Sequence, residues 1–221
     1  MRKLKPFVVA LCTVVLVAAG VLGTVAYLTD TTSVVNTFTV GNVNIRLDET
    51  KVDVNGEPVG DMNSDGEDDR TESGNEYHLV PGMRYVKDPT MTVLKGSEES
   101  YVRIVVTISC YSELTAIFGD PFLPQYFVEG WDSAVWVSTE VIDTDTENNT
   151  ATYEFRYYKT VEPAANSDLV LEALFTDMKV SDDLTGEQLA TIADLEITIH
   201  GHAIQAAGFA DADSAWAAFE E

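Results

Sequence analysis

Apolar and polar side chains alternate with a period of two along most of this chain, which is the pattern of half-buried β-strands. The clearest run covers residues 101–111. Its apolar face would consist of Val102, Ile104, Val106, Ile108 and Cys110. The pattern therefore predicts a strand that packs on the core, with Cys110 as a buried and inert thiol.

Shorter alternating runs, separated by turns of glycine and polar residues, predict further strands. They cover residues 34–47, 84–94, 135–142, 150–159 and 195–205, with one or two short strands within 168–180. In the first run Gly41-Asn42 shifts the phase, which favours a bulge, and in the second Pro89 forces an edge position or a bend. Asn55-Gly56 predicts the turn of a short hairpin.

Helical signals occur only near the end of the chain. Thr185 and Gln188 predict a capping box that opens a helix reaching Ala193, and residues 211–220 predict a terminal helix. About eight or nine strands without βαβ alternation favour an all-β fold. We therefore predict an antiparallel β-sandwich of jelly-roll or immunoglobulin type, with a short C-terminal helix and an N-terminal signal helix ahead of it.

The N-terminus has the order of a secretory signal peptide. A short basic stretch precedes an uncharged apolar run over residues 7–28, and small residues at its end predict a cut between Ala26 and Tyr27. The run is also long enough to cross a bilayer, so an uncleaved membrane anchor is the alternative. We expect a signal peptide over residues 1–26 and one secreted domain over residues 27–221.

Charge and composition limit the partners of this domain. The chain has 13 basic and 37 acidic residues, a formal net charge of −24. Such a surface repels nucleic acid and anionic lipid, so we expect no nucleic acid partner and membrane contact only through the signal segment. A hydrophobic fraction of 45% argues against general disorder. Because Cys12 lies in the signal run, Cys110 would be alone after cleavage, without an internal disulfide.

An acidic loop insertion within residues 55–76 matches the calcium-loop pattern D-x-[DN]-x-[DN]-G-x5-E. The expected oxygen ligands are Asp61, Asn63, Asp65, Glu67, Asp69 and Glu72. Gly66 would permit the sharp turn that the loop requires. Two features weaken the match, because no amphipathic helices flank the loop and Asp68 stands where an apolar residue normally anchors it. A solvated acidic insertion without metal is the alternative.

The last predicted strand carries a second group of possible ligands. Glu196, His200 and His202 alternate along it, and residues on one strand face can share a metal ion. A solvent-facing polar row is the alternative interpretation. The sequence contains no H-E-x-x-H, no G-x-S-x-G and no phosphate-binding glycine loop. We therefore expect a protein that is not an enzyme.

Several stretches together resemble one known family. They are Tyr27-Leu28-Thr29-Asp30 with Asn36-Thr37-Phe38-Thr39-Val40-Gly41, Pro81-Gly82 with Lys87-Asp88-Pro89-Thr90, Tyr101-Val102-Arg103, Tyr153-Glu154-Phe155-Arg156-Tyr157-Tyr158, and Ala203-Ile204-Gln205-Ala206 with Ala215-Trp216. In this order, and over nearly the whole chain, they resemble the TasA/camelysin-like proteins of Gram-positive bacteria. The resemblance implies a signal peptide cut by a dedicated ER-type signal peptidase, and a secreted jelly-roll sandwich. The best-known members build extracellular fibres of the biofilm matrix.

The resemblance also implies a mechanism, in which the N-terminal strand of one subunit completes the sheet of the next. An extended segment can supply a missing edge strand through main-chain hydrogen bonds, while alternate side chains fill apolar pockets. Residues 31–40 fit such a donor strand because they follow the expected cut directly. The side chains that would enter the acceptor are Val34, Asn36, Phe38 and Val40. Pairing of this segment within its own subunit is the alternative.

Two other functions remain open at this point. Camelysin relatives have been labelled metallo-endopeptidases, and here such an activity would use Glu196, His200 and His202. The second is a calcium-binding surface module that does not polymerise. The acidic insertion is not a core feature of the resembled family, so calcium binding would be an addition of this chain.

Overall fold

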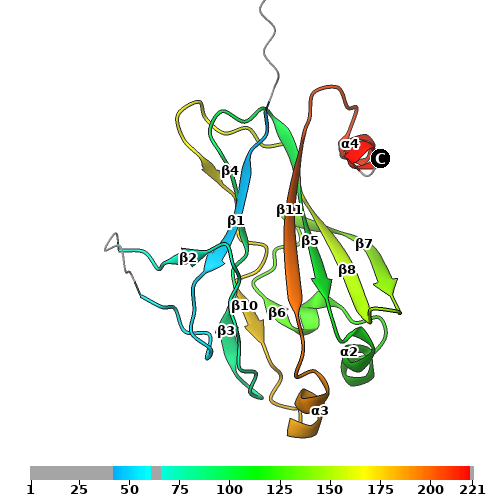
Figure 1. The fold of residues 1–221 in the computed structure, drawn as a ribbon. Helices are drawn as coiled ribbons and strands as arrows, with labels where there is room; N and C mark the ends of the chain where they lie inside the picture. Colours follow the sequence, from blue (N-terminus) through cyan, green and yellow to red (C-terminus); the bar gives the residue numbers. More distant parts are fainter. Residues whose placement is uncertain (1–41, 61–65, 220–221) are drawn as a thin grey trace, which may run out of the picture. The chain divides into compact units, whose positions relative to one another are not determined.

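The computed structural model describes residues 42–60 and 66–219. These residues form three antiparallel sheets with a few short helices, so the predicted all-β class is confirmed (Figure 1). The predicted signal peptide, the cut at Ala26 and the donor strand over residues 31–40 lie outside the described residues.

The first sheet has the order β2-β1-β4-β9. Its strands are β1 (Ile45–Thr50), β2 (Arg70–Thr71), β4 (Thr90–Val93) and β9 (Leu169–Val170). The second sheet, in the order β11-β5-β8-β7, contains β5 (Ser100–Ile108), β7 (Trp136–Asp145), β8 (Thr150–Tyr157) and β11 (Ile197–Gln205). A small third sheet, β3-β10-β6, is formed by β3 (Arg84–Val86), β6 (Val128–Glu129) and β10 (Asp177–Lys179).

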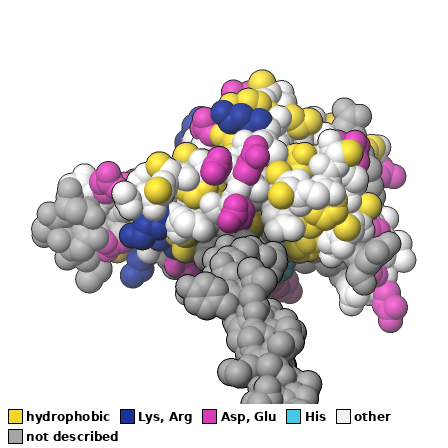
Figure 2. All heavy atoms as spheres, turned by 90° about the horizontal axis from the view of Figure 1, so that it is seen from above, with side chains coloured by type: hydrophobic (Ala, Val, Ile, Leu, Met, Phe, Trp, Pro, Cys, Tyr) yellow, Lys and Arg dark blue, Asp and Glu magenta, His cyan; other side chains and the backbone are white. Residues whose placement is uncertain are grey.

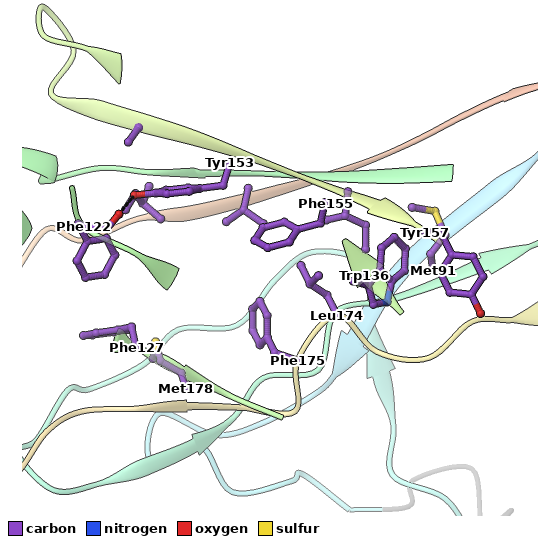
Figure 3. Close-up of a cluster of buried hydrophobic side chains, with 14 of the residues drawn as sticks. Met91, Phe122, Phe127, Trp136, Tyr153, Phe155, Tyr157, Leu174, Phe175 and Met178 are labelled. Carbon is purple, nitrogen blue, oxygen red and sulfur yellow. Dashed lines mark hydrogen bonds between the residues drawn. The ribbon is translucent and has the colours of Figure 1, made fainter. Parts of the chain in front are cut away.

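Large aromatic and aliphatic side chains fill the core between the sheets. The alternation in β8 predicts that Tyr153, Phe155 and Tyr157 share one face, and all three are buried there. Facing them in Figure 3 are Phe122, Phe127, Leu174 and Phe175, while Trp136 of β7 lies beside Tyr157 in the same sheet. Each fully buried side chain of this size stabilises the fold by about 1.5–3 kcal/mol. The packing of this core therefore stabilises the described fold.

The helices are short and lie at the ends of strands. They are α2 (Tyr111–Phe118), the 3-10 helix η1 (Pro124–Tyr126), α3 (Gly186–Thr191) and α4 (Ala212–Phe219). The predicted capping box is confirmed, since the Thr185 side chain accepts from Gln188 N at 3.2 Å and Gln188 Oε1 accepts from Thr185 N at 2.9 Å. The predicted terminal helix is confirmed as α4.

The prediction for Cys110 was wrong. The strand β5 ends at Ile108, and Cys110 is the half-buried N-cap of α2 with a left-handed φ of 54°. The alternation of side chains continues to Cys110, but the backbone does not. Tyr111 N donates to Asn149 O at 3.1 Å. This hydrogen bond to the turn before β8 ends the strand, and the helix α2 begins at Tyr111.

The single bent strand predicted over residues 84–94 is two strands in different sheets, β3 and β4. Pro89 stands between them and has no N–H to give to a ladder. The Asn55-Gly56 turn is confirmed, because Gly56 N donates to Asp53 O at 2.9 Å and Gly56 has a φ of +79°. The short strands predicted within 168–180 are confirmed as β9 and β10.

Candidate functional site

The strand β11 is an edge of its sheet, and half of its backbone groups point away from β5. Ser109 N donates to Glu196 O at 3.0 Å, which makes the even-numbered residues of β11 the hydrogen-bonded partners of β5. The N–H and C=O groups of Ile199, Gly201 and Ala203 therefore face the open edge. In the described part of the chain no strand pairs with this edge.

The strand β1 presents a second open edge. Leu94 N donates to Asn44 O at 2.9 Å, so the even-numbered residues of β1 are bonded to β4. The backbone groups of Ile45 and Leu47 consequently point to the other side. There β2 pairs only with the last two residues of β1, Glu49 and Thr50.

These two edges face each other across a groove. Figure 1 shows β1 and β11 side by side and running in opposite directions. A cavity of about 260 Å³ is lined by residues 47–49 of β1 and residues 196–199 at the start of β11. Cα atoms of the two strands approach within 8 Å, yet the strands share no ladder. A strand hydrogen-bonded to both would hold them about 9.6 Å apart, so the groove is narrower than a full strand at these points.

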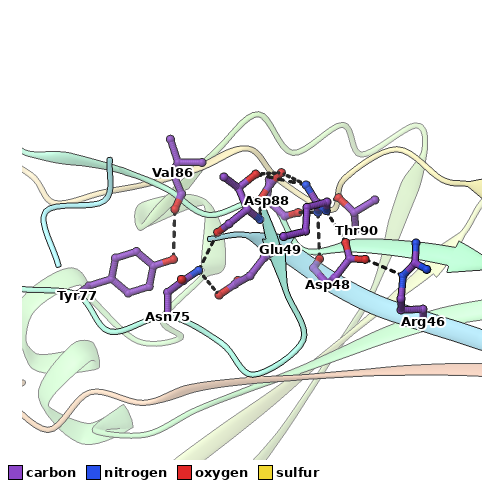
Figure 4. A network of polar contacts seen from close by, with 10 residues as sticks. Arg46, Asp48, Glu49, Asn75, Tyr77, Val86, Asp88 and Thr90 are labelled. Carbon is purple, nitrogen blue, oxygen red and sulfur yellow. Dashed lines mark hydrogen bonds and ion pairs between the residues drawn. The ribbon is translucent and has the colours of Figure 1, made fainter. Parts of the chain in front are cut away.

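Residues of the acidic insertion close one end of the groove. Thr71 in β2 pairs with Glu49, and residues 71–74 line the cavity between β1 and β11. Arg70 holds this segment in place through ion pairs with Asp48 and, at 2.8 Å, with Asp88. The network of polar contacts around β1 is drawn in Figure 4. The open part of the β1 edge is thus the N-terminal half of the strand.

The floor of the groove carries a buried ion pair. Lys87 Nζ lies 2.8 Å from Glu49 Oε2, and Asn75 Nδ2 donates to Glu49 Oε1 at 2.8 Å. The Tyr77 ring centroid lies 5.5 Å from Lys87 Nζ, and its hydroxyl donates to Val86 O at 3.2 Å. Burial and the negative charge of Glu49 raise the pKa of Tyr77. The tyrosine is therefore a neutral hydrogen-bond donor at neutral pH.

Sequence patterns did not predict this ion pair, although one signal was present. Glu49 follows Ile45 and Leu47 on the apolar face of its run, and Lys87 follows Tyr85 in the same way. Lys and Glu are rarely fully buried unless they are paired. Two residues of opposite charge at inward-facing positions could therefore have indicated a buried ion pair.

Three of the six predicted calcium ligands lie within the described residues. Outside the described residues lie Asp61, Asn63 and Asp65. Glu67 and Glu72 are exposed, and Asp69 O accepts a hydrogen bond from Lys51 N at 2.7 Å beside β2. Across residues 42–60 and 66–219, no group of three or more His, Cys, Asp or Glu side chains is arranged to hold a metal ion.

The two histidines of β11 have different surroundings. His200 is exposed, whereas His202 is half-buried and accepts a hydrogen bond from Arg103 Nε at its Nδ1, at 3.3 Å. The His202 ring also packs on Phe219 of α4, with the centroids 5.0 Å apart. Burial and then the positive charge of Arg103 lower the pKa of His202. Its contacts therefore hold α4 on the sheet, and His202 is not part of a solvent-facing row.

Comparison with known proteins adds no relative to this picture. No family model matches the chain, and neither the curated proteins nor the solved structures contain a match. Among the described helices, none is both long and apolar enough to cross a membrane.

Proposed function

We propose that this protein is a secreted structural protein of the cell surface or biofilm matrix, and that it forms fibres by donor-strand exchange. Residues 31–40 of one subunit would enter the groove between β1 and β11 of the next subunit. The observation that carries the proposal is the pair of facing strand edges, each without a full strand partner in the described residues. The inserted strand would complete a jelly-roll-like sandwich, as the family resemblance implies.

The N-terminal segment has the chemistry of such a donor. Residues 31–40 carry no charge, and Phe38 and Val40 lie on one face of an extended chain. Figure 2 shows acidic side chains spread over the end of the molecule where β1 begins, and the whole chain carries a net charge of −24. Since subunits of like charge repel, an uncharged donor adds no repulsion of its own. The signal helix over residues 1–26 would keep this segment from its acceptor until signal peptidase removes it.

The start of the described chain favours exchange between subunits over pairing within one subunit. Asn42 O accepts from Glu98 N at 3.0 Å and Asn44 O accepts from Leu94 N at 2.9 Å, so the chain is already paired from residue 42 onward. A hairpin needs a loop of at least two residues. Only Gly41 separates Asn42 from the donor strand. If the chain turned back into the groove of its own subunit, the turn would therefore have to include residues of the donor strand.

Insertion would require the groove to widen. Where β1 and β11 approach within 8 Å, a strand between them requires about 9.6 Å, so the two strands must separate by about 2 Å or more. The main-chain hydrogen bonds to Ile45, Leu47 and the odd-numbered residues of β11 would compensate for this opening.

Deletion of residues 27–36 from the exported protein is expected to abolish fibres in electron micrographs, because it removes six of the ten residues of the donor strand. A milder matched pair is Phe38→Asp, which places a charge on the inserted face, and Thr37→Asp, which places it on the opposite face. We expect no fibres from the first and fibres from the second. Unchanged fibres after the deletion would contradict donor-strand exchange, and an intact protein that never forms fibres would contradict the proposed function.

We also propose that the acidic insertion binds calcium weakly, with a dissociation constant of about 10⁻⁴–10⁻³ M, as in extracellular calcium modules. The proposal rests on the sequence pattern and on the anchoring of the following residues by Arg70. Calorimetric titration should show binding heat that is lost in Asp61→Ala. The matched control is Asp68→Ala, since position 68 is not a ligand in the pattern. The absence of heat at millimolar calcium would refute the site.

A further inference from the structure

Three side chains with complementary chemistry meet where Lys87 and Glu49 form the floor of the groove and Asn75 lines the adjoining cavity. Lys87 and Glu49 are only 6% and 5% exposed, and their ion pair of 2.8 Å joins Lys87 Nζ to Glu49 Oε2. The other carboxylate oxygen, Oε1, accepts from Asn75 Nδ2 at 2.8 Å (Figure 4). A single carboxylate thus bridges a primary amine and a primary amide. From this geometry we propose that Lys87 and Asn75 form an intramolecular isopeptide bond, with Glu49 transferring the protons.

The amide of Asn75 is held as an electrophile. Val52 N donates to Asn75 Oδ1 at 3.0 Å, and the second Nδ2 hydrogen is given to Thr50 O at 2.8 Å. When an amine attacks Cγ, negative charge develops on Oδ1, and a fixed backbone N–H aimed at that oxygen stabilises it. The same contacts fix the plane of the amide, so the carbon presents a constant face.

The amine of Lys87 is held as a nucleophile. An ammonium group has no free electron pair, so a lysine acts as a nucleophile only after a neighbouring base takes its proton. Glu49 is within hydrogen-bond distance of Nζ and is the base in the required position. Burial beside the Tyr77 ring keeps both groups away from bulk water. The amine has then to swing from Glu49 Oε2 to the carbon of Asn75.

The reaction is balanced without an oxidant, a reductant or another reactant. Lys87 Nζ gives one proton to Glu49 and attacks Asn75 Cγ, which forms the new C–N bond. Glu49 delivers this proton to Nδ2 and accepts the second proton from Nζ. The Cγ–Nδ2 bond then breaks, and ammonia leaves with that proton as ammonium, which restores the carboxylate of Glu49. A cavity of about 520 Å³ lined by Asn75, Tyr77 and Lys87 gives the ammonia a way out.

The bond would tie the segment that follows β2 to the connection between β3 and β4. Residues 73–77 and Lys87 line the same cavity, so the cross-link would fix one wall of the groove to its floor. This chemistry is independent of fibre formation. It would occur in a protein that remains monomeric, and its absence would leave the donor-strand proposal unaffected.

Mass spectrometry of the purified full chain tests the proposal. The folded protein should be lighter than its sequence by about 17 Da, the mass of the ammonia displaced by the lysine nucleophile. Trypsin should release residues 71–84 joined to residues 85–95, with no cleavage after Lys87, because an acylated lysine is not a trypsin site. Location matters, since a succinimide at Asn55-Gly56 also loses ammonia but lies in another peptide and forms no cross-link.

Two variants assign the roles. Asn75→Ala removes the electrophile and should restore both the full mass and cleavage after Lys87. Glu49→Gln keeps the amine and the amide but removes the base, and should lower the cross-linked fraction at least tenfold. A Glu49→Gln protein that cross-links as fully as the parent would overturn the role of Glu49. Because either variant could fold poorly, the parent protein decides the main point. A parent of full mass, cleaved after Lys87, would overturn the proposal.

Discussion

The variant Ala203→Pro is expected to fold as the parent does and to form no fibres. The N–H of Ala203 points to the open edge of β11, so proline removes no bond to β5. It does remove a donor to the incoming strand and places its ring at the contact. A main-chain hydrogen bond is worth about 0.5–1.5 kcal/mol, so its loss alone should weaken strand insertion about 2- to 13-fold, and the steric clash of the ring adds to this loss.

The matched control is Ile204→Pro, one residue further along the same strand. The N–H of Ile204 faces β5, where this residue pairs with Tyr101. Proline there breaks the ladder of the subunit itself, so the free energy of unfolding should fall by about 1–3 kcal/mol. Thermal unfolding and electron microscopy of both variants separate the two effects. Normal fibres from Ala203→Pro would show that the edge of β11 is not the acceptor.

The variant Gly56→Ala is expected to lower the free energy of unfolding by about 3 kcal/mol, which combines left-handed strain with overpacking. Gly56 has a φ of +79°, and a Cβ there would lie 2.6 Å from Tyr85 Cα. Backbone atoms of Tyr85 cannot move aside as the end of a flexible side chain can. The hairpin turn would therefore lose its contact with the core.

Gly74→Ala isolates the backbone part of this effect. Gly74 has nearly the same φ, +76°, but a Cβ there has no atom within 4 Å. We expect it to cost only the left-handed strain of about 1–2 kcal/mol. Urea unfolding of the two variants measures the difference. Equal losses would show that the close approach of Tyr85 to Gly56 does not contribute.

Local patterns predicted the parts of the fold that local physics determines. The alternation in β8 predicts its buried face because successive side chains of a strand point to opposite faces of the sheet, and one of these faces packs on the core. The capping box at Thr185 was predictable because its partner, Gln188, is three residues away. The end of β5 was not predictable, since it depends on Asn149, which lies far along the chain and bonds to Tyr111.

Less of the candidate site could be predicted from the sequence. The sequence predicts that residues 195–205 form a strand, but an edge is a property of the order of strands in the sheet. Among the described residues, β11 pairs only with β5 and β1 pairs fully only with β4, which leaves the two edges that border the groove. Likewise Glu49, Asn75 and Lys87 come together only after β1, β2 and β4 have assembled.

Hydrogen exchange of individual backbone amides tests the central claim most directly, because it reports whether each N–H gains a partner. In the soluble subunit, the amides of Ile199, Gly201 and Ala203 should exchange fast while the even-numbered amides between them are protected. In fibres, these three amides and those of Ile45 and Leu47 should become protected, with no change at the even-numbered positions. Fibres in which the five amides still exchange as in the soluble subunit would contradict insertion of a donor strand between β1 and β11.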